Sequence, residues 1–595
     1  MLTTIRQSLH SFQNQTKGLG PLAILLFLHF LVLACFFAPA ISTPDANGYL
    51  AQARIIAREG RTDIVTESPA QYVGDHWMPV RDGQYYGQYP PGLPALLAVV
   101  FRLLGPVASL WVIPLMGTLA LLALFLIVRS WFGPDWALIA TILMAVNPFG
   151  NAHALGADSH TAVCFFLLWG IWALLCWESS RSSLWAAVAG FCFGMIPTIR
   201  YPEALFLAPA LYLVATAWRR SWGVRSLIAG TIAACLPMAA LAARNQHAFG
   251  AFWRTGYSIS GEQTGFGPGY FVRSFLPYIL LTVSIGAFVV FLAGVLGIRI
   301  LCRHSEPIQV RRGRFLLLLT LPITLLYMSY YWGPSHNSMR FLLPTFYIYA
   351  IGAAAWFQRQ VETDPDRGWK RVRLVVGLGI VWGVTLTFFE LRSLKRDNTA
   401  LAELTRGLQE VVAPGSLLIA SSGIQQHLDF VGDWRLVAEE TFDRNPRRQP
   451  HVRGGPRPPE SEPDERIDPV ERSRSTRLEL AHWAGPSRKV YWLTTRPNLD
   501  RVQPRLSQQD EWIPVAELRV SPRPGPPPPG RGDREPNPGP PRGWLPWGPP
   551  PPPPDRDGPP GRRGPGGPGG GPPPHFEPPP DGRMLLVEWR IHEPG

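Results

Sequence analysis

The sequence predicts a mainly α-helical membrane protein: a polytopic transmembrane helical bundle of about 11 spans, with a small C-terminal α/β extracytoplasmic domain. Only 17% of the 595 residues are charged, where soluble proteins have roughly 25%. Long apolar runs separated by short polar loops occupy residues 21–390. After residue 397 the chain is mostly polar, and Pro and Gly dominate beyond residue 521. These features indicate a membrane bundle with a polar appendix.

Each span of the bundle needs about 20 mostly apolar residues. The first run, 21–41, contains Ala38-Pro39-Ala40, which resembles a signal cleavage site. Its apolar stretch is longer than the roughly 7–15 residues of a signal peptide, so we interpret it as a retained anchor. The expected spans are 21–41, 107–128, 135–149, 159–177, 184–199, 201–218, 226–243, 275–300, 314–331, 341–357 and 373–391.

The orientation follows from Lys and Arg in the short loops, which favour the cytoplasmic side. With a cytoplasmic N-terminus (1–20), basic residues recur in every second loop, as the rule requires. The predicted location is therefore the bacterial inner membrane, with a multi-pass domain over 21–391 and a periplasmic domain over 392–595. The segments expected outside are 42–106, which carries interfacial helices, 150–158, 244–274, 332–340 and the chain after 391.

Charge and cysteine content exclude two other classes of protein. The net charge is +13, but the Arg residues of the bundle act as topology determinants and those of the tail are interspersed with acids, so no compact nucleic-acid footprint is expected. All six cysteines lie in or beside apolar runs, without CxxC spacing. Neither a disulfide framework nor a structural zinc site is expected.

The first outer segment begins with Asp45, directly after the first span. Residues 46–59 have the pattern of an interfacial amphipathic helix with Tyr49 on its apolar face. Asp45 either caps this helix or faces a polar cavity, because an acid at a span's exit is costly against lipid. The same segment ends in Tyr89-Pro90-Pro91-Gly92. This turn either only starts a helix or offers Tyr side chains that stack on a sugar.

The second outer loop carries Asp158 and His160 where a span re-enters the membrane. A helix cap is again the simpler interpretation of Asp158. Two acids from separate outer loops, both at the same membrane surface, are nevertheless a more specific pattern than either acid alone.

Several further outer residues are basic or polar. An Arg at a membrane boundary often extends to the lipid headgroups. The functional alternative is a cluster that binds an anionic lipid phosphate, which suits the planar guanidinium. The candidates are Arg200, Arg244, Arg254, His336, Asn337 and Arg340.

In order, spacing and side of the membrane, these motifs resemble the C superfamily of membrane glycosyltransferases. The nearest groups are the protein O-mannosyltransferases, the lipid A aminoarabinose transferases and their bacterial relatives. The likeness covers residues 20 to about 390 and rests on four short motifs. They are Asp45-x-x-x-Tyr49-Leu50-x-x-Ala53, Tyr89-Pro90-Pro91-Gly92, Asp158 at the start of a span, and Arg340-Phe341-Leu342-Leu343-Pro344.

Two departures from that family limit what it implies. Many eukaryotic members have paired acids after the first span, whereas Ala46 follows Asp45 here. The aminoarabinose-type enzymes carry Glu-Lys before the Pro pair, and here these positions are Gln88 and Tyr89. An aminoarabinose donor or a lipid A acceptor is therefore not inferred.

The resemblance implies an inverting transfer of a sugar from a polyprenyl-phosphate donor to a hydroxyl of a lipid, glycan or protein acceptor. Asp45 would be the general base, with Asp158 as the second catalytic residue. No cofactor is expected, and no dense ligand spacing supports a divalent metal held by Asp45, Asp158 and His160. Donor phosphate would be bound by Arg200, Arg244, Arg254, Arg340 and His336, and substrate by Tyr49, Tyr89, His160 and Asn337.

The C-terminal part shows a helical pattern over 398–412 and buried strands over 416–422, 490–494 and 584–589. Two inserts, 444–476 and 521–582, are rich in Pro or in Pro and Gly, and we expect them to be disordered. No catalytic motif is visible here.

Two other functions remain as alternatives. A transporter or flippase of lipid-linked sugars predicts broken helices and charges near the bilayer midplane. A non-catalytic membrane scaffold for cell-envelope assembly predicts tolerance to the loss of Asp45 and Asp158.

Overall fold

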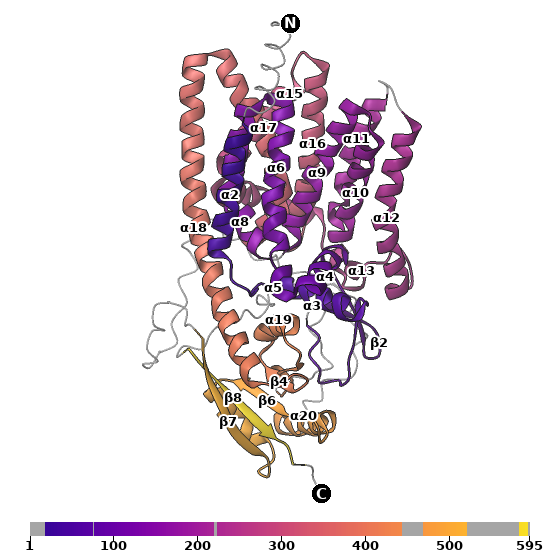
Figure 1. Cartoon of the computed structure of the whole chain (residues 1–595), viewed down its shortest axis with the longest axis vertical. Coiled ribbons are helices and arrows are strands. Elements are labelled where there is room, and N and C mark those ends of the chain that lie inside the picture. Colours follow the sequence, from indigo (N-terminus) through magenta and orange to yellow (C-terminus); the bar gives the residue numbers. More distant parts are fainter. Residues whose placement is uncertain are drawn as a thin grey trace, which may run out of the picture.

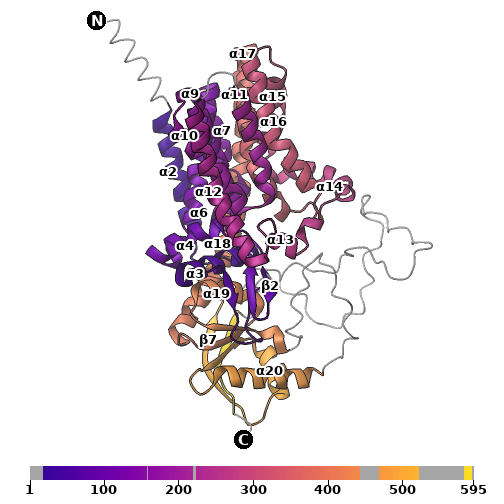
Figure 2. The same cartoon turned by 90° about the vertical axis from the view of Figure 1, so that its right-hand side faces the viewer.

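The computed structural model describes residues 18–74, 76–156, 158–218, 223–442, 468–520 and 582–592. Its helices stand side by side in a long bundle, and a small sheet lies at one end (Figure 1). The described chain begins at the opposite end of the bundle, at the start of α2, as Figure 2 also shows. The predicted fold class is confirmed: the chain is mainly helical, with a small C-terminal domain that contains strands.

Seven helices among the described residues are long and apolar enough to cross a membrane, or up to eight if a bent pair is one span. The bundle also contains shorter apolar helices, so the chain is a multi-pass membrane protein. Its helices are α2 (Leu19–Phe36), α6 (Val112–Phe132), α7 (Pro134–Ala145), α8 (Pro148–Leu155), α9 (Ser159–Ser180), α10 (Ser183–Ile199), α11 (Leu207–Trp218), α12 (Val224–Phe249), α14 (Pro268–Leu281), α15 (Phe288–Cys302), α16 (Pro307–Met328), α17 (Leu343–Thr363) and α18 (Pro365–Val411).

Three predicted helices differ from the observed ones. The span expected over 135–149 is a pair, α7 and α8, bent by 60°, where Pro148 excludes Asn147 from helical backbone geometry. The span expected over 275–300 is divided between α14 and α15 by a π-helical turn. The helix expected over 398–412 is the end of α18, a single helix of 47 residues, about 70 Å long.

The segment between α2 and α6 forms a layer across one end of the bundle. Its amphipathic helix is present as α3, and α4 follows the two prolines. Both helices lie across the bundle axis, with α5 beside them (Figure 1). A small antiparallel sheet of order β1-β3-β2 was not predicted, because its strands are only three to five residues long. The bounds are α3 (Pro44–Glu59), β1 (Asp63–Val65), β2 (Trp77–Arg81), β3 (Gln84–Gly87), α4 (Gly92–Leu104) and α5 (Pro106–Ser109).

The C-terminal part contains a five-stranded sheet of order β5-β4-β6-β8-β7. Strand β4 pairs in parallel with both of its neighbours, and β8 is antiparallel to β6 and β7. The three predicted strands are present as β4, β6 and β8; β5 and β7 were missed. The elements are β4 (Leu417–Ala420), α19 (Ser422–Val431), β5 (Arg435–Ala438), α20 (Pro469–Ala484), β6 (Val490–Thr494), α21 (Arg496–Val502), β7 (Glu511–Arg519) and β8 (Arg583–Arg590).

The two expected inserts fall mainly outside the described residues. Of the insert over 444–476, residues 469–476 form the first turns of α20, and 444–467 are not described. Residues 521–581 of the second insert are likewise outside the described part of the chain.

The sheet is attached to the layer below the bundle through α19 and β5. Arg54 of α3 donates a 2.6 Å hydrogen bond to the Gly432 carbonyl and lies 3.6 Å from the Asp429 carboxylate. Phe430 is fully buried within the main core cluster of the bundle. The Tyr72 amide donates to the Leu436 carbonyl at 2.8 Å. The C-terminal domain therefore holds α3 and the chain that follows it from outside.

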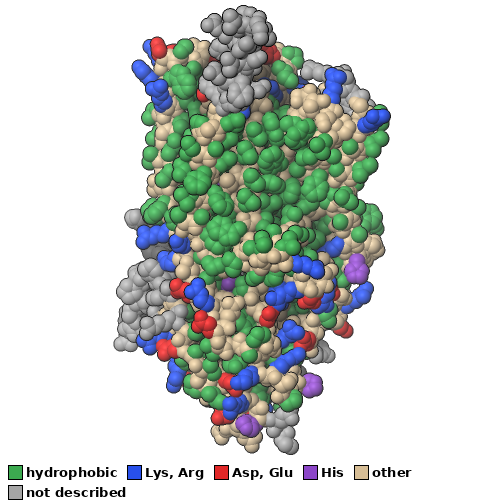
Figure 3. Space-filling model, in the orientation of Figure 1, with side chains coloured by type: hydrophobic (Ala, Val, Ile, Leu, Met, Phe, Trp, Pro, Cys, Tyr) green, Lys and Arg blue, Asp and Glu red, His purple; other side chains and the backbone are tan. Residues whose placement is uncertain are grey.

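The surface of the bundle matches a membrane environment. On the face shown in Figure 3, hydrophobic side chains form a broad belt across the helices. Lys and Arg lie at the upper edge of this belt, and side chains of both charges cover the lower part, around the sheet. The described core is also apolar and rich in Ala, Leu, Ile and Phe.

A substitution at a tightly packed glycine tests the helix packing of this bundle. We expect Gly297→Ala to lower the unfolding temperature, because a Cβ there would overlap the Gly352 carbonyl where α15 and α17 meet. Overpacking of this kind costs about 1–3 kcal/mol. The matched control is Gly377→Ala in α18, where a Cβ would meet nothing within 4 Å. Equal unfolding temperatures for the two purified variants would contradict the packing of α15 on α17.

Candidate active site

The site is centred on Asp45, in the first turn of α3. Thr43, not Asp45, holds the N-cap position of this helix, so the capping interpretation of Asp45 is wrong. The Asp45 carboxylate instead forms an ion pair with Arg340 and accepts a 3.3 Å hydrogen bond from the Tyr89 hydroxyl. The Nε2 atom of His76 lies 3.7 Å from the same carboxylate.

Local sequence explains why these groups converge. Gly48 lies one turn beyond Asp45, and a Cβ there would lie 2.7 Å from the Tyr89 ring and 2.9 Å from the His76 Cβ. The missing side chain therefore lets both rings approach α3. The Tyr89 ring stacks on Tyr49 at a centroid distance of 4.6 Å and an interplanar angle of 10°.

A second cation, Arg200, lies at the end of α10. It is buried and donates to Glu203 at 2.6 Å, to the Ser159 hydroxyl at 3.1 Å and to the Tyr327 hydroxyl at 3.2 Å. Tyr49 donates to the same Ser159 hydroxyl at 2.8 Å. Arg200 is thus connected to the aromatic pair beside Asp45 through one serine.

Both guanidinium groups lie near the aromatic ring of Phe341. The Cζ atom of Arg200 lies 5.6 Å from its centroid and that of Arg340 lies 5.4 Å from it. Cations at this distance from an aromatic ring are stabilised electrostatically. Phe341 therefore holds two like charges near each other at one end of the bundle.

Asp158 lies next to this cluster but has its own partners. It caps α9 by accepting a 2.8 Å hydrogen bond from the His160 amide, and it forms an ion pair with His153. The capping interpretation thus describes Asp158. The two carboxylates have separate ion partners, and the charge of Arg340 acts on both.

Both carboxylates are ionised at neutral pH. Burial by itself would raise the pKa of Asp45, but Arg340, His76, Arg200 and the Tyr89 hydroxyl outweigh it and leave the pKa below its usual value. Burial also opposes ionisation of Asp158, and the pKa is again lowered, mainly by His153. The site therefore contains two anions balanced by arginines and histidines.

The other predicted residues lie away from Asp45. Arg244 donates to the Gly87 carbonyl at 2.9 Å, and its guanidinium lies 4.8 Å from the Phe249 ring centroid. These contacts indicate that Arg244 stabilises the fold. Arg254 is exposed, with a 3.5 Å bond to the Phe249 carbonyl. His336 is exposed and bonds Glu390 of α18 at 2.7 Å, beside the exposed Asn337. The structure does not bring these four side chains to the carboxylate.

Two buried side-chain nitrogens near the cluster have no hydrogen-bond partner among the described residues. They are the Nε atom of Arg340 and the Nδ1 atom of His160. Buried polar groups normally have hydrogen-bond partners. The unused Nε–H of Arg340, whose charge already balances Asp45, leaves capacity for a further anion.

Sequence reasoning missed His76, Ser159, Glu203 and Glu262. Glu262 accepts a 3.3 Å hydrogen bond from Gln88 and a shorter one from Tyr330. Burial raises its pKa, so it is the carboxyl of this region that protonates most easily. Of these four residues, only Glu203 has a signal in the local sequence. It follows Arg200 by three positions, a spacing that allows contact within one helical turn.

No group of three or more His, Cys, Asp or Glu side chains in the described parts of the chain has a geometry that would hold a metal ion. The chemistry available at Asp45 is that of an ionised carboxylate beside two arginines, at one end of the helical bundle. Such a set can accept a proton and stabilise a phosphate anion.

The Asp45–Arg340 pair gives a measurable prediction. We expect Asp45→Asn and Arg340→Gln each to destabilise the protein, and the double variant to lose less than the sum, with a coupling of about 0.5–3 kcal/mol. The pKa of Asp45 lies below its unfolded value of about 3.9. Its stabilisation is therefore present above that pH and is lost as the pH falls through the folded pKa.

Thermal unfolding of the four proteins at pH 7 and at lower pH measures this coupling. The matched exposed pair is Glu517 with Arg583, whose charges lie 3.1 Å apart on the C-terminal sheet. Exposed pairs contribute about 0–1 kcal/mol. Additive losses for Asp45 and Arg340 at pH 7 would show that the two side chains do not interact.

Comparison with known proteins finds a family match for part of the chain and solved structures with a similar fold. Residues 88–242 match the family model "Dolichyl-phosphate-mannose-protein mannosyltransferase", and no curated protein matches the chain. The crystal structure of ArnT from Cupriavidus metallidurans bound to undecaprenyl phosphate has the same fold, with a TM-score of 0.55 and 12% identity over 84% of this chain and 96% of that one. The apo structure of the same protein gives 0.53 at the same identity and coverage. Residues 88–242 are thus similar to this mannosyltransferase family, and the chain shares its fold with the ArnT structures.

Proposed function

We propose that the chain transfers a sugar from a polyprenyl-phosphate donor to an acceptor hydroxyl, with Asp45 as the general base. The observation that carries this proposal is the ionised Asp45 carboxylate held between Arg340, His76 and the Tyr89 hydroxyl. The ArnT structure with bound undecaprenyl phosphate supports the class of donor. The segment that matches the mannosyltransferase model begins at residue 88 and includes Tyr89, Asp158 and Arg200.

The reaction is a single displacement that inverts the anomeric centre. The acceptor oxygen forms a bond to the anomeric carbon, and the bond from that carbon to the phosphate oxygen breaks. Asp45 takes the proton of the acceptor hydroxyl, and the polyprenyl phosphate leaves with the electron pair. Arg340 and Arg200 stabilise the charge that develops on the phosphate, as preorganised cations do in other transfer reactions.

Arg340 has two successive roles in this scheme. Without substrate its charge lowers the pKa of Asp45, which makes the carboxylate a weak base. When the guanidinium turns toward the donor phosphate, with its free Nε as an additional donor, Asp45 loses its main counter-charge. Its pKa then rises toward the range in which a general base is effective. Donor binding thereby activates the base.

The remaining site residues position these groups. Asp158 begins α9 and orients His153 and the start of the helix that carries Ser159. Tyr49 is buried and connects Asp45's helix to Ser159, which favours a supporting role over contact with a sugar. Tyr89 is only partly buried; its ring stacks on Tyr49 and its hydroxyl donates to the Asp45 carboxylate.

The proposed side of the membrane is the periplasmic face of a bacterial inner membrane. Basic loops recur at the other end of the helices, as the positive-inside rule predicts. The candidate site and the C-terminal sheet lie together at the end remote from the start of α2 (Figure 1). A polyprenyl-phosphate sugar in the outer leaflet would approach Asp45 from the bilayer, and the acceptor would approach from the aqueous side.

Asp45→Asn tests the role of the base. We expect transfer from radiolabelled polyprenyl-phosphate sugars, assayed in membranes that hold equal amounts of folded protein, to fall by about 10²–10⁴. The matched variant is Asp158→Asn, which should lose less than about tenfold because Asn is as good an N-cap as Asp.

Both outcomes of that assay are informative. Equal transfer by wild type and Asp45→Asn would remove Asp45 from the mechanism, and a larger loss for Asp158→Asn would reverse the two roles. Failure of the wild type to transfer any of a panel of hexose and pentose donors would favour a transporter or a scaffold.

A further inference from the structure

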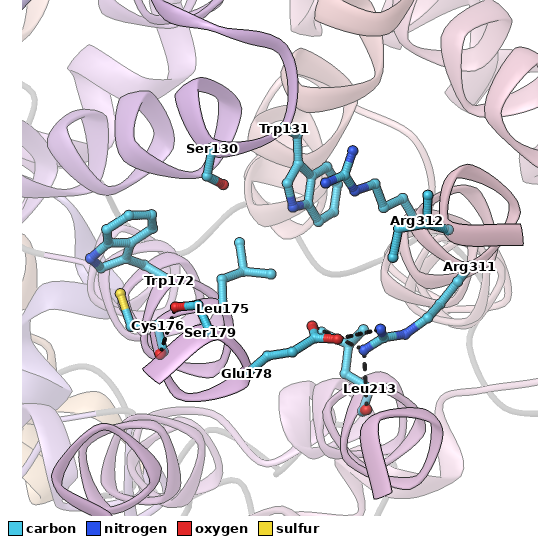
Figure 4. A pocket seen from close by; sticks show the side chains of 11 residues that line it. Ser130, Trp131, Trp172, Leu175, Cys176, Glu178, Ser179, Leu213, Arg311 and Arg312 are labelled. Carbon is cyan, nitrogen blue, oxygen red and sulfur yellow. Dashed lines mark hydrogen bonds and ion pairs between the residues drawn. The ribbon is translucent and has the colours of Figure 1, made fainter. Parts of the chain in front are cut away.

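A pocket of about 300 Å³ lies at the other end of the bundle, between α6, α9, α11 and α16. Its lining includes Trp131, Trp172 and Glu178, with Arg311 and Arg312 from the second turn of α16. Figure 4 shows these side chains around the opening. The reaction proposed above uses none of them.

Helix α9 connects this pocket to the candidate active site. Ser159 at its start bonds Arg200, and Glu178 near its end lines the pocket. A rise of about 1.5 Å per residue separates the two by about 28 Å, close to the roughly 30 Å thickness of a hydrocarbon core. The pocket therefore lies at the opposite membrane surface.

One of the two arginines is committed to the protein. Arg311 makes two bonds to the Glu178 carboxylate, one of them 3.1 Å long, and donates to the Thr216 hydroxyl at 2.8 Å. The Leu213 carbonyl accepts a further bond at 3.4 Å. Arg311 and Glu178 thus neutralise each other, and Figure 4 shows them joined across the lower part of the pocket.

The other arginine, Arg312, keeps most of its hydrogen-bond donors free. Among the described residues the only hydrogen bond of Arg312 is to the Gln309 side chain, at 3.3 Å. Its guanidinium lies 5.1 Å from the centroid of the Trp131 ring, which fixes the group at the pocket (Figure 4). A guanidinium has five N–H donors, so most of those of Arg312 remain available. With two arginines and one carboxylate, Glu178, the pocket lining has a net charge of +1.

The rest of the lining indicates an amphipathic ligand. Leu175, Leu213 and Ile308 provide apolar walls beside the charge. Trp is typical of membrane–water interfaces, and basic pockets between transmembrane helices bind anionic lipid headgroups. A free phosphate ion would use the guanidinium but not these apolar walls.

We propose that this pocket binds the phosphate headgroup of an anionic phospholipid from the leaflet opposite the candidate active site. Arg312 holds the phosphate through its free donors, Trp131 holds Arg312 in place, and the apolar walls contact the glycerol and the first acyl carbons. This site does not depend on the proposed sugar transfer.

Native mass spectrometry of the full-length protein in neutral detergent tests the site. With added phosphatidylglycerol we expect a retained lipid, bound about tenfold more tightly than phosphatidylcholine. Arg312→Gln should remove most of this preference, and Arg312→Lys, which keeps the charge but not the planar fork, should retain part of it. The matched control is Arg314→Gln, an exposed arginine of the same helix that does not line the pocket.

Three results would overturn the proposal. The first is equal retention of both lipids by the wild type. The second is the same effect of Arg312→Gln and Arg314→Gln, which would indicate general surface charge. The third is displacement of the lipid by millimolar inorganic phosphate alone, which would identify free phosphate as the ligand. If Arg312→Gln does not fold, as judged by its unfolding temperature, unchanged lipid preference in Arg312→Lys and in Trp131→Leu would equally contradict the site.

Discussion

The ion pair between Asp45 and Arg340 is the interaction on which the rest of this end of the protein depends. A carboxylate at the exit of a membrane span is costly unless a cation or water compensates it. Arg340 supplies that cation from the start of a distant span. The pair joins the layer formed by α3 to the bundle, and removing either partner alone would leave the other, partly buried charge without its main counter-charge.

This constraint explains how the elements at this end of the bundle act together. Helix α3 must be held firmly for Asp45 to keep its geometry, and α19 and β5 of the C-terminal sheet hold it through Arg54 and the chain at Tyr72. Gly48 allows Tyr89 and His76 to reach the carboxylate. The sheet carries no candidate catalytic group of its own among the described residues. Its contribution is to fix the position of α3, whose first turn carries Asp45.

Much of this architecture could be predicted from the sequence, because the membrane imposes simple rules. Apolar length marked most spans, and the motifs at Asp45, Tyr89, Asp158 and Arg340 indicated one end of the bundle. Contacts between distant segments could not be predicted in this way. Apart from the short motif that begins at Arg340, no local pattern indicates that Arg340 reaches Asp45 while Arg254 stays exposed. His76 and Glu262 lie in loops without periodicity, so only the folded chain brings them near the carboxylate.

A structure of the protein with a bound polyprenyl phosphate would test the central claim most directly. The account predicts phosphate oxygens within hydrogen-bond distance of the Arg340 and Arg200 guanidinium groups, with Asp45 released from its ion pair and open to the aqueous side. A phosphate bound elsewhere, with Asp45 and Arg340 still joined, would contradict it.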